Sequence, residues 1–339
     1  MILVTGGTGL VGVHLLMELC ESVDLGIVAI YRSKDSLAHA KSVFLNYSPY
    51  KEATNKWKKI QWSKADITNV PVLIKVFESN AISNVYHCAG LVSFQTPDFE
   101  QLKKINIEGT ANLVNLSIDY KVHKFCYVSS ISTLNLNPNQ SILEETSKWN
   151  SEQDNSGYAI SKFGGEMEVW RGSEEGLIVV IVHPGVIVGK GFTTGSSAIF
   201  CSVKQGLSFY TTGVTGYVSA FDVAKAMNRL MQSKIKNDNF VLVSENISHK
   251  KVIDLIANIF RKKSPKWKVS EIVVRIISKL EAVFGLFTNR KSKIPYDMIG
   301  SLFSISTYSS NKIKKAIDFS FEPMDPVIVE VAKAFTSKD

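Results

Sequence analysis

Short apolar runs alternate with helical patterns from the first residue of the chain. The apolar runs predict strands, at residues 1–5, 26–31, 60–65, 84–88, 124–129 and 177–183. The stretches between them predict helices, at residues 9–21, 35–46, 69–79, 99–120 and 156–174. Strands that alternate with helices at this spacing form βαβ units, which indicates a parallel sheet. The last run is apolar from 177 to 182, as is typical of a central strand buried on both faces.

This regular alternation ends after about Pro184. Glycine-rich turns follow, and the later pattern predicts a strand near 217–220, a helix from Asp222, a strand near 239–243, a basic helical region and a final helix after Pro326. There is no recognisable internal repeat or low-complexity linker. We therefore predict an α/β, Rossmann-type doubly wound parallel sheet at 1–185, to which segments near 215–245 contribute. A smaller substrate-binding or lid region is predicted at 186–339.

The composition is that of a globular protein. Of the 339 residues, 45% are hydrophobic and 21% are charged, which excludes disordered, collagen-like and coiled-coil classes. The four cysteines are far apart and the six histidines are scattered, so we expect no disulfide framework and no metal site. No run reaches the roughly 18 apolar residues of a spanning helix, and a glycine-rich motif begins at Thr5, where a signal peptide would lie. We expect a cytoplasmic protein.

The net charge of +8 is concentrated in one stretch. Residues 260–293 contain ten basic and two acidic residues, and the rest of the chain is neutral. Such an excess attracts anions, for example a nucleotide, an acidic lipid or an acidic substrate. The alternative is a solvated helix face. Because this stretch has no interleaved aromatic platform and no known recognition motif, we expect no nucleic-acid partner.

A glycine-rich turn separates the first predicted strand from the first predicted helix. Gly7, Gly9 and Gly12 match G-x-G-x-x-G, and Gly6, Gly9 and Gly12 match G-x-x-G-x-x-G equally well. Glycines let backbone N–H groups approach a pyrophosphate, and the helix N-terminus adds partial positive charge. A purely structural turn is the alternative. The motif predicts a dinucleotide site made of Thr5, Gly6, Gly7, Thr8, Gly9, Leu10, Val11 and Gly12.

The end of the second predicted strand favours NADP over NAD. NAD-binding proteins usually have an acidic residue about 20 positions after the glycines, which binds the ribose 2′-OH. Here residues 30–34 read IYRSK, without a carboxylate. The Arg32 guanidinium is suited to a 2′-phosphate, with Ser33 or Lys34 assisting; alternatively, Arg32 stacks on the adenine or faces solvent. Asp66, after the third strand, suits the adenine amino group and can also cap the next helix.

Tyr158 and Lys162 lie one turn apart on the same face of the helix predicted at 156–174. A lysine there is expected to stabilise the phenolate and to lower the tyrosine pKa from about 10. Such a phenol exchanges a proton with a carbonyl or an alcohol near neutral pH. The strand predicted at 124–129 ends in hydroxyl residues, Ser129 and Ser130, at the sheet edge where α/β proteins bind ligands.

These motifs, in this order, resemble the extended short-chain dehydrogenase/reductase family over nearly the whole chain. The matching segments are TGGTGLVG at 5–12, DI at 66–67, HCAG at 87–90, NIEGTANL at 106–113, VSS at 128–130, Tyr158 with Lys162, and HPGVIVG at 183–189. The resemblance implies a Rossmann-type fold, a nicotinamide cofactor and a catalytic triad of Ser130, Tyr158 and Lys162. In that triad Tyr158 is the general acid or base, Ser130 orients the substrate oxygen, and Lys162 holds the ribose hydroxyls.

The resemblance also assigns further cofactor contacts. Those expected along the dinucleotide are Asp66, Ile67, Cys88, Ala89, Gly90, Tyr158 and Lys162, and those expected to flank the nicotinamide are Pro184 and Val186. Asn106 either braces the fourth strand or supports a proton path, whereas His87 and His183 are expected to pack at strand ends. A homodimer through the helices at 99–120 and 156–174 is common in the family.

Three functions are compatible with these residues. The first is hydride transfer to or from an apolar ketone or alcohol, as in the dihydroflavonol-reductase and 3β-hydroxysteroid-dehydrogenase branches. The second is a nucleotide-sugar epimerase, but Arg32 fits such enzymes poorly because they often retain NAD. A dehydratase is disfavoured because Ile131 and Ser132 stand where an acidic pair is usual. The third is a non-catalytic NADP-binding regulator, although such members commonly lose the tyrosine or the lysine, and this chain keeps both.

The segment at 272–287 leaves the role of the basic region open. Polar Glu271, Arg275 and Lys279 recur at intervals of four, with bulky apolar residues elsewhere. Such a helix could cover an apolar substrate pocket or rest on a membrane surface beside the basic residues. An ordinary buried helix is the alternative. The sequence thus predicts a small-molecule substrate but does not name it.

Overall fold

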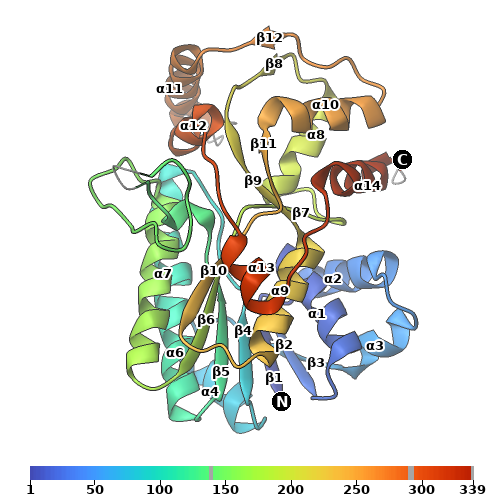
Figure 1. Ribbon diagram of the computed structural model, residues 1–339, viewed down its shortest axis with the longest axis vertical. Coiled ribbons are helices and arrows are strands. Elements are labelled where there is room, and N and C mark those ends of the chain that lie inside the picture. Colours follow the sequence, from blue (N-terminus) through green and yellow to red (C-terminus); the bar gives the residue numbers. More distant parts are fainter. Residues whose placement is uncertain (137–139, 289–293, 337–339) are drawn as a thin grey trace.

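The computed structural model describes residues 1–136, 140–288 and 294–336, with the backbone alone for 282–288. Its centre is a parallel sheet of seven strands within these residues, in the order β10-β6-β5-β4-β1-β2-β3 (Figure 1). The strands are β1 (Ile2–Thr5), β2 (Ile27–Tyr31), β3 (Ile60–Lys64), β4 (Asn84–His87), β5 (Lys124–Val128), β6 (Ile178–Pro184) and β10 (Asp238–Leu242). Strands β1 to β6 lie in the order 6-5-4-1-2-3, which is that of the dinucleotide-binding doubly wound fold. The predicted fold class is therefore confirmed.

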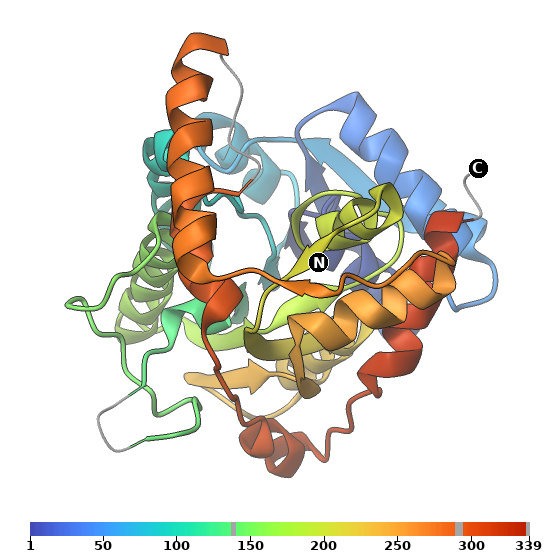
Figure 2. The ribbon, with the colours of Figure 1, turned by 90° about the horizontal axis from the view of Figure 1, so that it is seen from above.

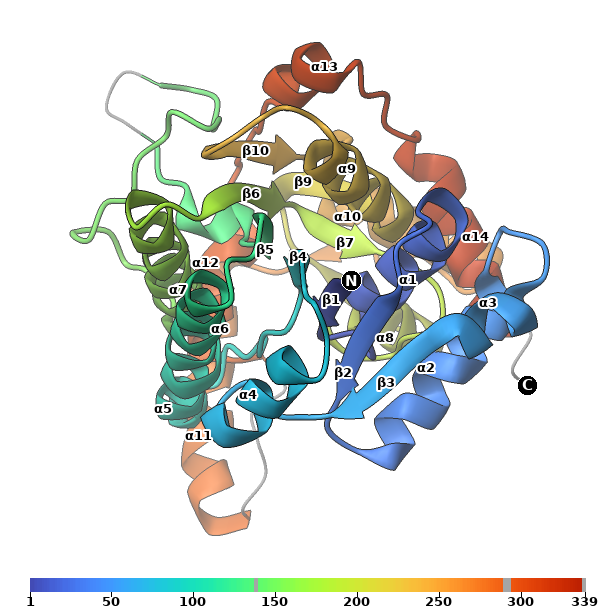
Figure 3. The same cartoon turned by 90° about the horizontal axis from the view of Figure 1, so that it is seen from below.

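Both faces of this sheet are buried, as the apolar runs of the sequence predict. Ile2 and Val4 face one core, and Leu3 between them faces the other, because successive side chains of a strand point to opposite faces. Helices α1 (Leu10–Ser22), α2 (Lys34–Tyr47) and α9 (Ala220–Gln232) cover the first face, and α4 (Val70–Glu78), α6 (Gly109–Asp119) and α7 (Gly157–Glu174) cover the second (Figure 3).

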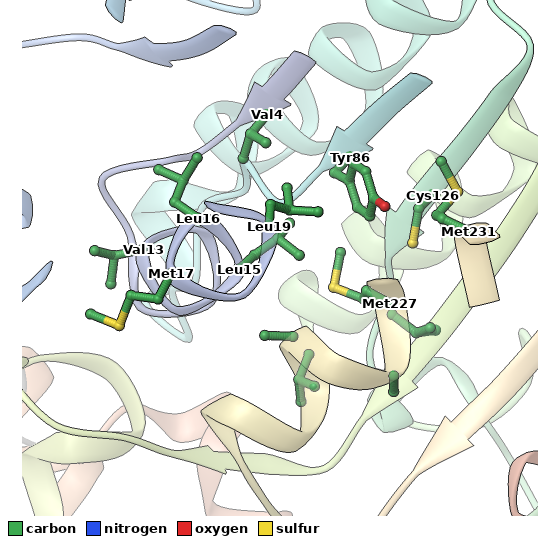
Figure 4. Close-up of a cluster of buried hydrophobic side chains, with 14 of the residues drawn as sticks. Val4, Val13, Leu15, Leu16, Met17, Leu19, Tyr86, Cys126, Met227 and Met231 are labelled. Atoms are coloured by element: carbon green, nitrogen blue, oxygen red, sulfur yellow. The ribbon is translucent and has the colours of Figure 1, made fainter. Parts of the chain in front are cut away.

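The first core joins the N-terminal helix to a much later one. Helix α9 packs along α1, and both present apolar side chains to the same strands. Figure 4 shows side chains of this core, among them Val4, Val13, Leu15, Leu16, Met17, Leu19, Tyr86, Cys126, Met227 and Met231. The chain therefore returns to the first sheet after leaving it, and β10 then extends that sheet beside β6.

The helix predicted at 99–120 is divided into three parts. A short turn, α5 (Phe99–Leu102), leads into a π-helical segment at 103–108 and then into α6. Helix α7 lies close against this segment, because Gly165 has no side chain: a Cβ there would be 2.3 Å from the Asn106 carbonyl oxygen. π-Helical turns often occur at functional sites, and this one places Asn106 beside α7.

The later part of the chain forms a second, smaller core. It contains a three-stranded sheet with the strand order β11-β9-β7. These strands are β7 (Val186–Val188), β9 (Val214–Ser219) and β11 (Glu245–Ser248). Helices α8 (Ala198–Gln205), α10 (His249–Ile259) and α14 (Met324–Thr336) pack on it. The final helix was expected after Pro326 but begins at Met324. A proline fits there because the first amides of a helix have no intrahelical acceptor.

Other described elements include three helices and a short strand pair. They are α3 (Ala53–Lys59), α12 (Tyr296–Phe303) and α13 (Asn311–Ile317), with β8 (Phe209–Tyr210) paired to β12 (Trp267–Lys268). Helix α11 (Glu271–Thr288) extends beyond the body of the molecule (Figure 2). Ile272, Ile276 and Leu280 on it are more than half exposed, so for the described side chains the interpretation of 272–287 as an ordinary buried helix is wrong. In the part of the chain that the structure describes, no helix combines the length and apolar character needed to cross a bilayer.

Candidate active site

The glycine-rich turn connects β1 to the N-terminus of α1. The Gly9 N–H donates to the Gly6 carbonyl oxygen (2.9 Å), which closes the turn. Gly9 is the N-cap of α1, and neither a side-chain cap nor an acidic residue is present in the first turn. The first backbone N–H groups of the helix are therefore available for an anion. Thr5 is buried, Thr8, Leu10 and Val11 are half-buried, and Gly9 is exposed.

The structure distinguishes the two glycine patterns that the sequence left open. Gly6 has φ +66°, and a Cβ there would be 2.6 Å from the Ala89 backbone nitrogen. A Cβ at Gly12 would be 2.1 Å from the Gly6 carbonyl oxygen, whereas one at Gly7 would meet only side chains, at 3.2 Å or more. Gly9 and Gly12 belong to both patterns, and the close approach at Gly6 makes the pattern Gly6, Gly9, Gly12 the one that fits the backbone.

The residues expected around the adenosine end lie after β2 and β3. Arg32 directly follows β2 and is exposed. The Ser33 hydroxyl accepts from the Ser36 N–H (3.1 Å) as the N-cap of α2, so it has a structural role. Asp66 does not cap α4. Its carboxylate accepts from the Thr68 N–H (2.9 Å), and the N-cap is Asn69.

The loop after β4 connects the glycine turn to α7. The Ala89 N–H donates to Thr5 Oγ1 (3.2 Å), and Thr5 Oγ1 lies 2.7 Å from His87 Nδ1. On the other side, an ideal Cβ on Gly90 would lie 3.8 Å from Lys162 Nζ. Cys88, Ala89 and Gly90 therefore pass between the expected phosphate site and the expected catalytic lysine.

His87 and Asn106 brace this loop from behind. His87 Nε2 lies 2.9 Å from Thr110 Oγ1, and burial lowers the pKa of His87 to about 3, so the ring is neutral. Asn106 donates to the Leu91 carbonyl oxygen (2.9 Å) and accepts from the Leu91 N–H (2.7 Å). His87 bonds the hydroxyls of Thr5 and Thr110, which agrees with its expected packing role, and Asn106 holds the Leu91 backbone, which agrees with its bracing alternative.

Ser130 and Tyr158 meet at the carboxyl end of β5. A hydrogen bond with the Ser130 side chain acts to lower the pKa of Tyr158, but burial outweighs it and raises that pKa overall. The Tyr158 ring also lies 5.4 Å from the Phe94 ring. The neighbouring hydroxyls are used differently: Ser132 donates to Ser130 (3.0 Å), and Ser129 donates to Glu166 (2.6 Å). Of Ser129, Ser130 and Ser132, Ser130 is the one whose side chain acts on the pKa of Tyr158.

Lys162 lies below this pair, against the sheet edge. Its ammonium donates to the Val128 carbonyl oxygen (2.7 Å) and sits 4.2 Å from the Tyr127 ring centre. Burial lowers the pKa of Lys162 to about 7, against the opposing charge of Glu166. The expectation that Lys162 lowers the pKa of Tyr158 is wrong for this structure, because Lys162 is engaged with backbone and burial controls the phenol.

Glu166 is a buried acid that the sequence reading did not single out. Its carboxylate accepts from Ser129 and from Thr133 (3.3 Å) and lies 3.7 Å from His183 Nδ1. It follows Lys162 by four residues, so Tyr158, Lys162 and Glu166 occupy successive turns of one face of α7. The spacing of four between Lys162 and Glu166 is the feature of the sequence that places this acid beside the lysine. Glu166 and His183 together hold the segment that carries Ser130, since His183 also contacts the Ser130 carbonyl oxygen (3.3 Å).

The remaining expected contacts lie where β6 leads into β7. Pro184 is the buried last residue of β6, and half-buried Val186 opens β7. Ile67 is buried, and its side chain packs on Gly109 of α6. A cavity of about 410 Å³ lies beside the site; Gly157 and Ile160, on either side of Tyr158, line it together with Asp297 of α12. The triad itself does not line this cavity.

A family model of NAD-binding proteins, described as male sterility protein, matches residues 4–214. The chain belongs to the extended short-chain dehydrogenase/reductase family. The chain is 23% identical to cinnamoyl-CoA reductase 1 of Petunia hybrida over 70% of its own length and 71% of that protein. It is 23% identical to a putative dihydroflavonol 4-reductase of Synechocystis, over 78% and 73% of the two chains. The predicted family is therefore confirmed.

Two further comparisons extend this family picture. The chain is 27% identical to the L-2-aminoadipate reductase large subunit of Eremothecium gossypii over 58% of its own length, but the match spans only 16% of that protein. The crystal structure of UDP-glucose 4-epimerase with UDP-glucose from Thermotoga maritima superimposes with a TM-score of 0.75, at 20% identity over 99% of both chains. That likeness concerns the fold of this extended short-chain dehydrogenase/reductase.

Proposed function

We propose that the protein is an NAD(P)-dependent reductase of a carbonyl substrate, with Tyr158 as the proton donor. The observation that carries this proposal is the state of the phenol. Burial keeps the phenol of Tyr158 protonated at neutral pH, and the Ser130 side chain at the carboxyl end of β5 acts to lower its pKa. A protonated phenol carries the proton that a general acid donates, and a neighbouring hydroxyl stabilises the phenolate that remains.

The glycine turn fits a dinucleotide. Its backbone leaves no room for a Cβ at Gly6 or Gly12, and the helix behind it starts without a cap. When bound, a nicotinamide dinucleotide supplies the hydride that a carbonyl reduction requires. Thr5–Gly12 would hold its pyrophosphate, and Ala89, Gly90 and Lys162 would line the part that reaches toward Tyr158.

Residues of the chain would supply the proton and hold the reacting groups in position. Tyr158 would hold the proton destined for the substrate oxygen, and the bond from Ser130 would stabilise the phenolate that forms when this proton leaves. Lys162, whose ammonium donates to the Val128 carbonyl oxygen, would hold the ribose hydroxyls of the cofactor. The buried carboxylate of Glu166 would keep the segment of Ser129 and Ser130 in position.

We infer a preference for NADP from Arg32. The side chain is exposed directly after β2 and forms no ion pair within the described residues, and residues 30–34 at the tip of that strand contain no carboxylate to meet a ribose hydroxyl. A guanidinium is well matched to a phosphate. Two of the relatives are named as reductases of cinnamoyl-CoA and of dihydroflavonol, which favours an apolar carbonyl compound as the substrate.

The test is a screen of aldehydes, ketones and thioesters with NADPH and NADH, followed by Tyr158→Phe. Loss of the phenolic proton should lower kcat about a hundred- to ten-thousand-fold, while calorimetry should show an unchanged Kd for NADPH. Tyr120→Phe, at the end of α6 and 36% exposed, is the control and should turn over normally.

Three outcomes would contradict the proposal. Full turnover by Tyr158→Phe would remove the phenol from the mechanism. Inversion of a nucleotide sugar without net consumption of NADPH would indicate an epimerase. Tight NADPH binding without turnover of any compound in the screen would indicate a non-catalytic regulator.

A further inference from the structure

Helix α11 presents its apolar side to solvent. Its most exposed apolar residues form a stripe, Ile272 (71% exposed), Val273 (45%), Ile276 (54%), Ile277 (44%) and Leu280 (55%). At 3.6 residues per turn these five positions span about 140° of the helix surface. An apolar face of that width normally faces a core. The apolar pattern of α11 therefore predicts that this face is buried, whereas in the structure these side chains are exposed.

The opposite side of α11 is the one that packs. Val274 is 4% exposed and Ser278 is 2% exposed, and the helix contacts α12. Arg275 pairs with Glu271 (2.6 Å) and lies over the Tyr296 ring of α12. The orientation of α11 is therefore fixed by contacts on its inner side, and the apolar stripe is left without a partner within the described residues.

Two exposed aromatic residues lie at the same end of the molecule. Trp267 of β12 stands opposite Phe209 of β8 in the strand pair, and these side chains are 71% and 55% exposed. Figure 1 shows β8, β12 and α11 together at the top of the view, away from the N-terminus. Exposed tryptophan beside apolar surface is typical of residues that sit at a membrane–water interface.

A cluster of cations precedes this helix. Arg261, Lys262, Lys263, Lys266 and Lys268 are exposed, and none of them forms an ion pair within the described residues. Between residues 260 and 281 there are seven basic and two acidic residues. The three other basic residues expected to contribute, Arg290, Lys291 and Lys293, lie outside the described residues. The charge therefore sits directly beside the apolar stripe and the aromatic pair.

We propose that this face docks on the surface of a bilayer that carries anionic lipids. The apolar stripe and Trp267 would enter the headgroup region, and the cations would meet lipid phosphates and carboxylates. A second copy of the chain is a poorer occupant, because a symmetric contact would bring two positively charged faces together. The docking does not depend on the proposed reaction, since none of these residues belongs to the triad or to the glycine turn.

The experiment is co-sedimentation of the full chain with vesicles of phosphatidylcholine alone or mixed with phosphatidylserine. The native protein should bind the mixed vesicles and be released by salt. Ile272→Ser with Ile276→Ser should reduce the bound fraction roughly ten-fold, and so should Lys262→Glu with Lys263→Glu. All four side chains are exposed, so the variants should keep the native thermal unfolding temperature.

Matched controls carry the same chemical changes elsewhere. Leu25→Ser removes an apolar residue that is 49% exposed between α1 and β2, and Lys51→Glu with Lys58→Glu reverses two exposed charges near α3. Both controls should bind like the native protein. Equal binding to both vesicle types, equal loss in the controls, or a change from dimer to monomer in Ile272→Ser with Ile276→Ser would overturn the proposal; the last result would assign the face to a second copy.

Discussion

At the scale of single residues, burial controls the chemistry of the candidate site. The pKa of Lys162 falls to about 7, and the pKa of Tyr158 rises, because both charged forms lose water. The spacing of the two residues in the sequence predicts that they share a helix face, and they do. It did not predict that Lys162 would donate to the Val128 carbonyl oxygen, since that contact depends on how α7 lies against β5.

Arg32 gives the first prediction at this scale. Arg32→Ala should weaken NADP binding about ten- to a hundred-fold, because a charge-assisted bond to the 2′-phosphate is lost. NAD binding should stay unchanged. Isothermal titration of both cofactors measures this, with Arg261→Ala, an exposed arginine in the basic region, as the control. An equal loss for both cofactors, or a lower Kd for NAD than for NADP in the native protein, would refute the assignment.

At the scale of elements, close backbone approaches set the positions of the helices. Gly12 lets α1 begin against the glycine turn, and Gly165 lets α7 lie against the π-helical segment. The sequence predicts the extent of both helices to within a residue or two. The division of the 99–120 helix was not predicted, because a single π-helical turn changes the helical period too briefly to show in a short apolar pattern. The contact of Asn106 with Leu91, 15 residues earlier in the chain, also depends on tertiary structure.

The second prediction concerns Gly12. In Gly12→Ala the new Cβ would be 2.1 Å from the Gly6 carbonyl oxygen, so the turn must move. We expect a loss of about 1–3 kcal/mol in unfolding free energy and a marked loss of dinucleotide binding in a fluorescence titration. Gly300→Ala is a matched control in α12, where a Cβ would meet nothing within 4 Å. The idea fails if both variants bind the dinucleotide equally.

At the scale of the whole molecule, two buried histidines couple stability to pH. Burial lowers the pKa of His14 to about 4 and that of His87 to about 3. His14 lies in α1 and contacts the Phe221 ring of α9, 4.7 Å away. His87 of β4 contacts the hydroxyls of Thr5 in β1 and Thr110 in α6. Both histidines therefore stand at junctions between parts of the chain that are far apart in sequence, and both are neutral in the folded protein.

The third prediction follows from these lowered pKa values. The unfolded chain binds protons at His14 and His87 below about pH 6.5 and the folded chain does not, so stability should decrease as the pH falls toward about pH 4. Each histidine should contribute a slope of about 1.4 kcal/mol per pH unit. Urea unfolding at several pH values measures it.

Two variants identify the protons involved. His14→Gln should reduce the slope by one histidine's share, whatever it does to overall stability. His123→Gln, at an exposed position, should leave the slope unchanged. A slope that is the same in all three proteins would show that the buried histidines are not responsible.

The sequence by itself determined the alternation of strands and helices, the glycine turn and the family, because these depend on local pattern and on residues close together in the chain. Only the tertiary structure decided which serine meets Tyr158, that Glu166 lies beneath the site, and that the apolar face of α11 points outward. Those features depend on contacts between distant segments. Periodicity shows that a helix has an apolar side, but only packing decides whether that side meets protein or solvent.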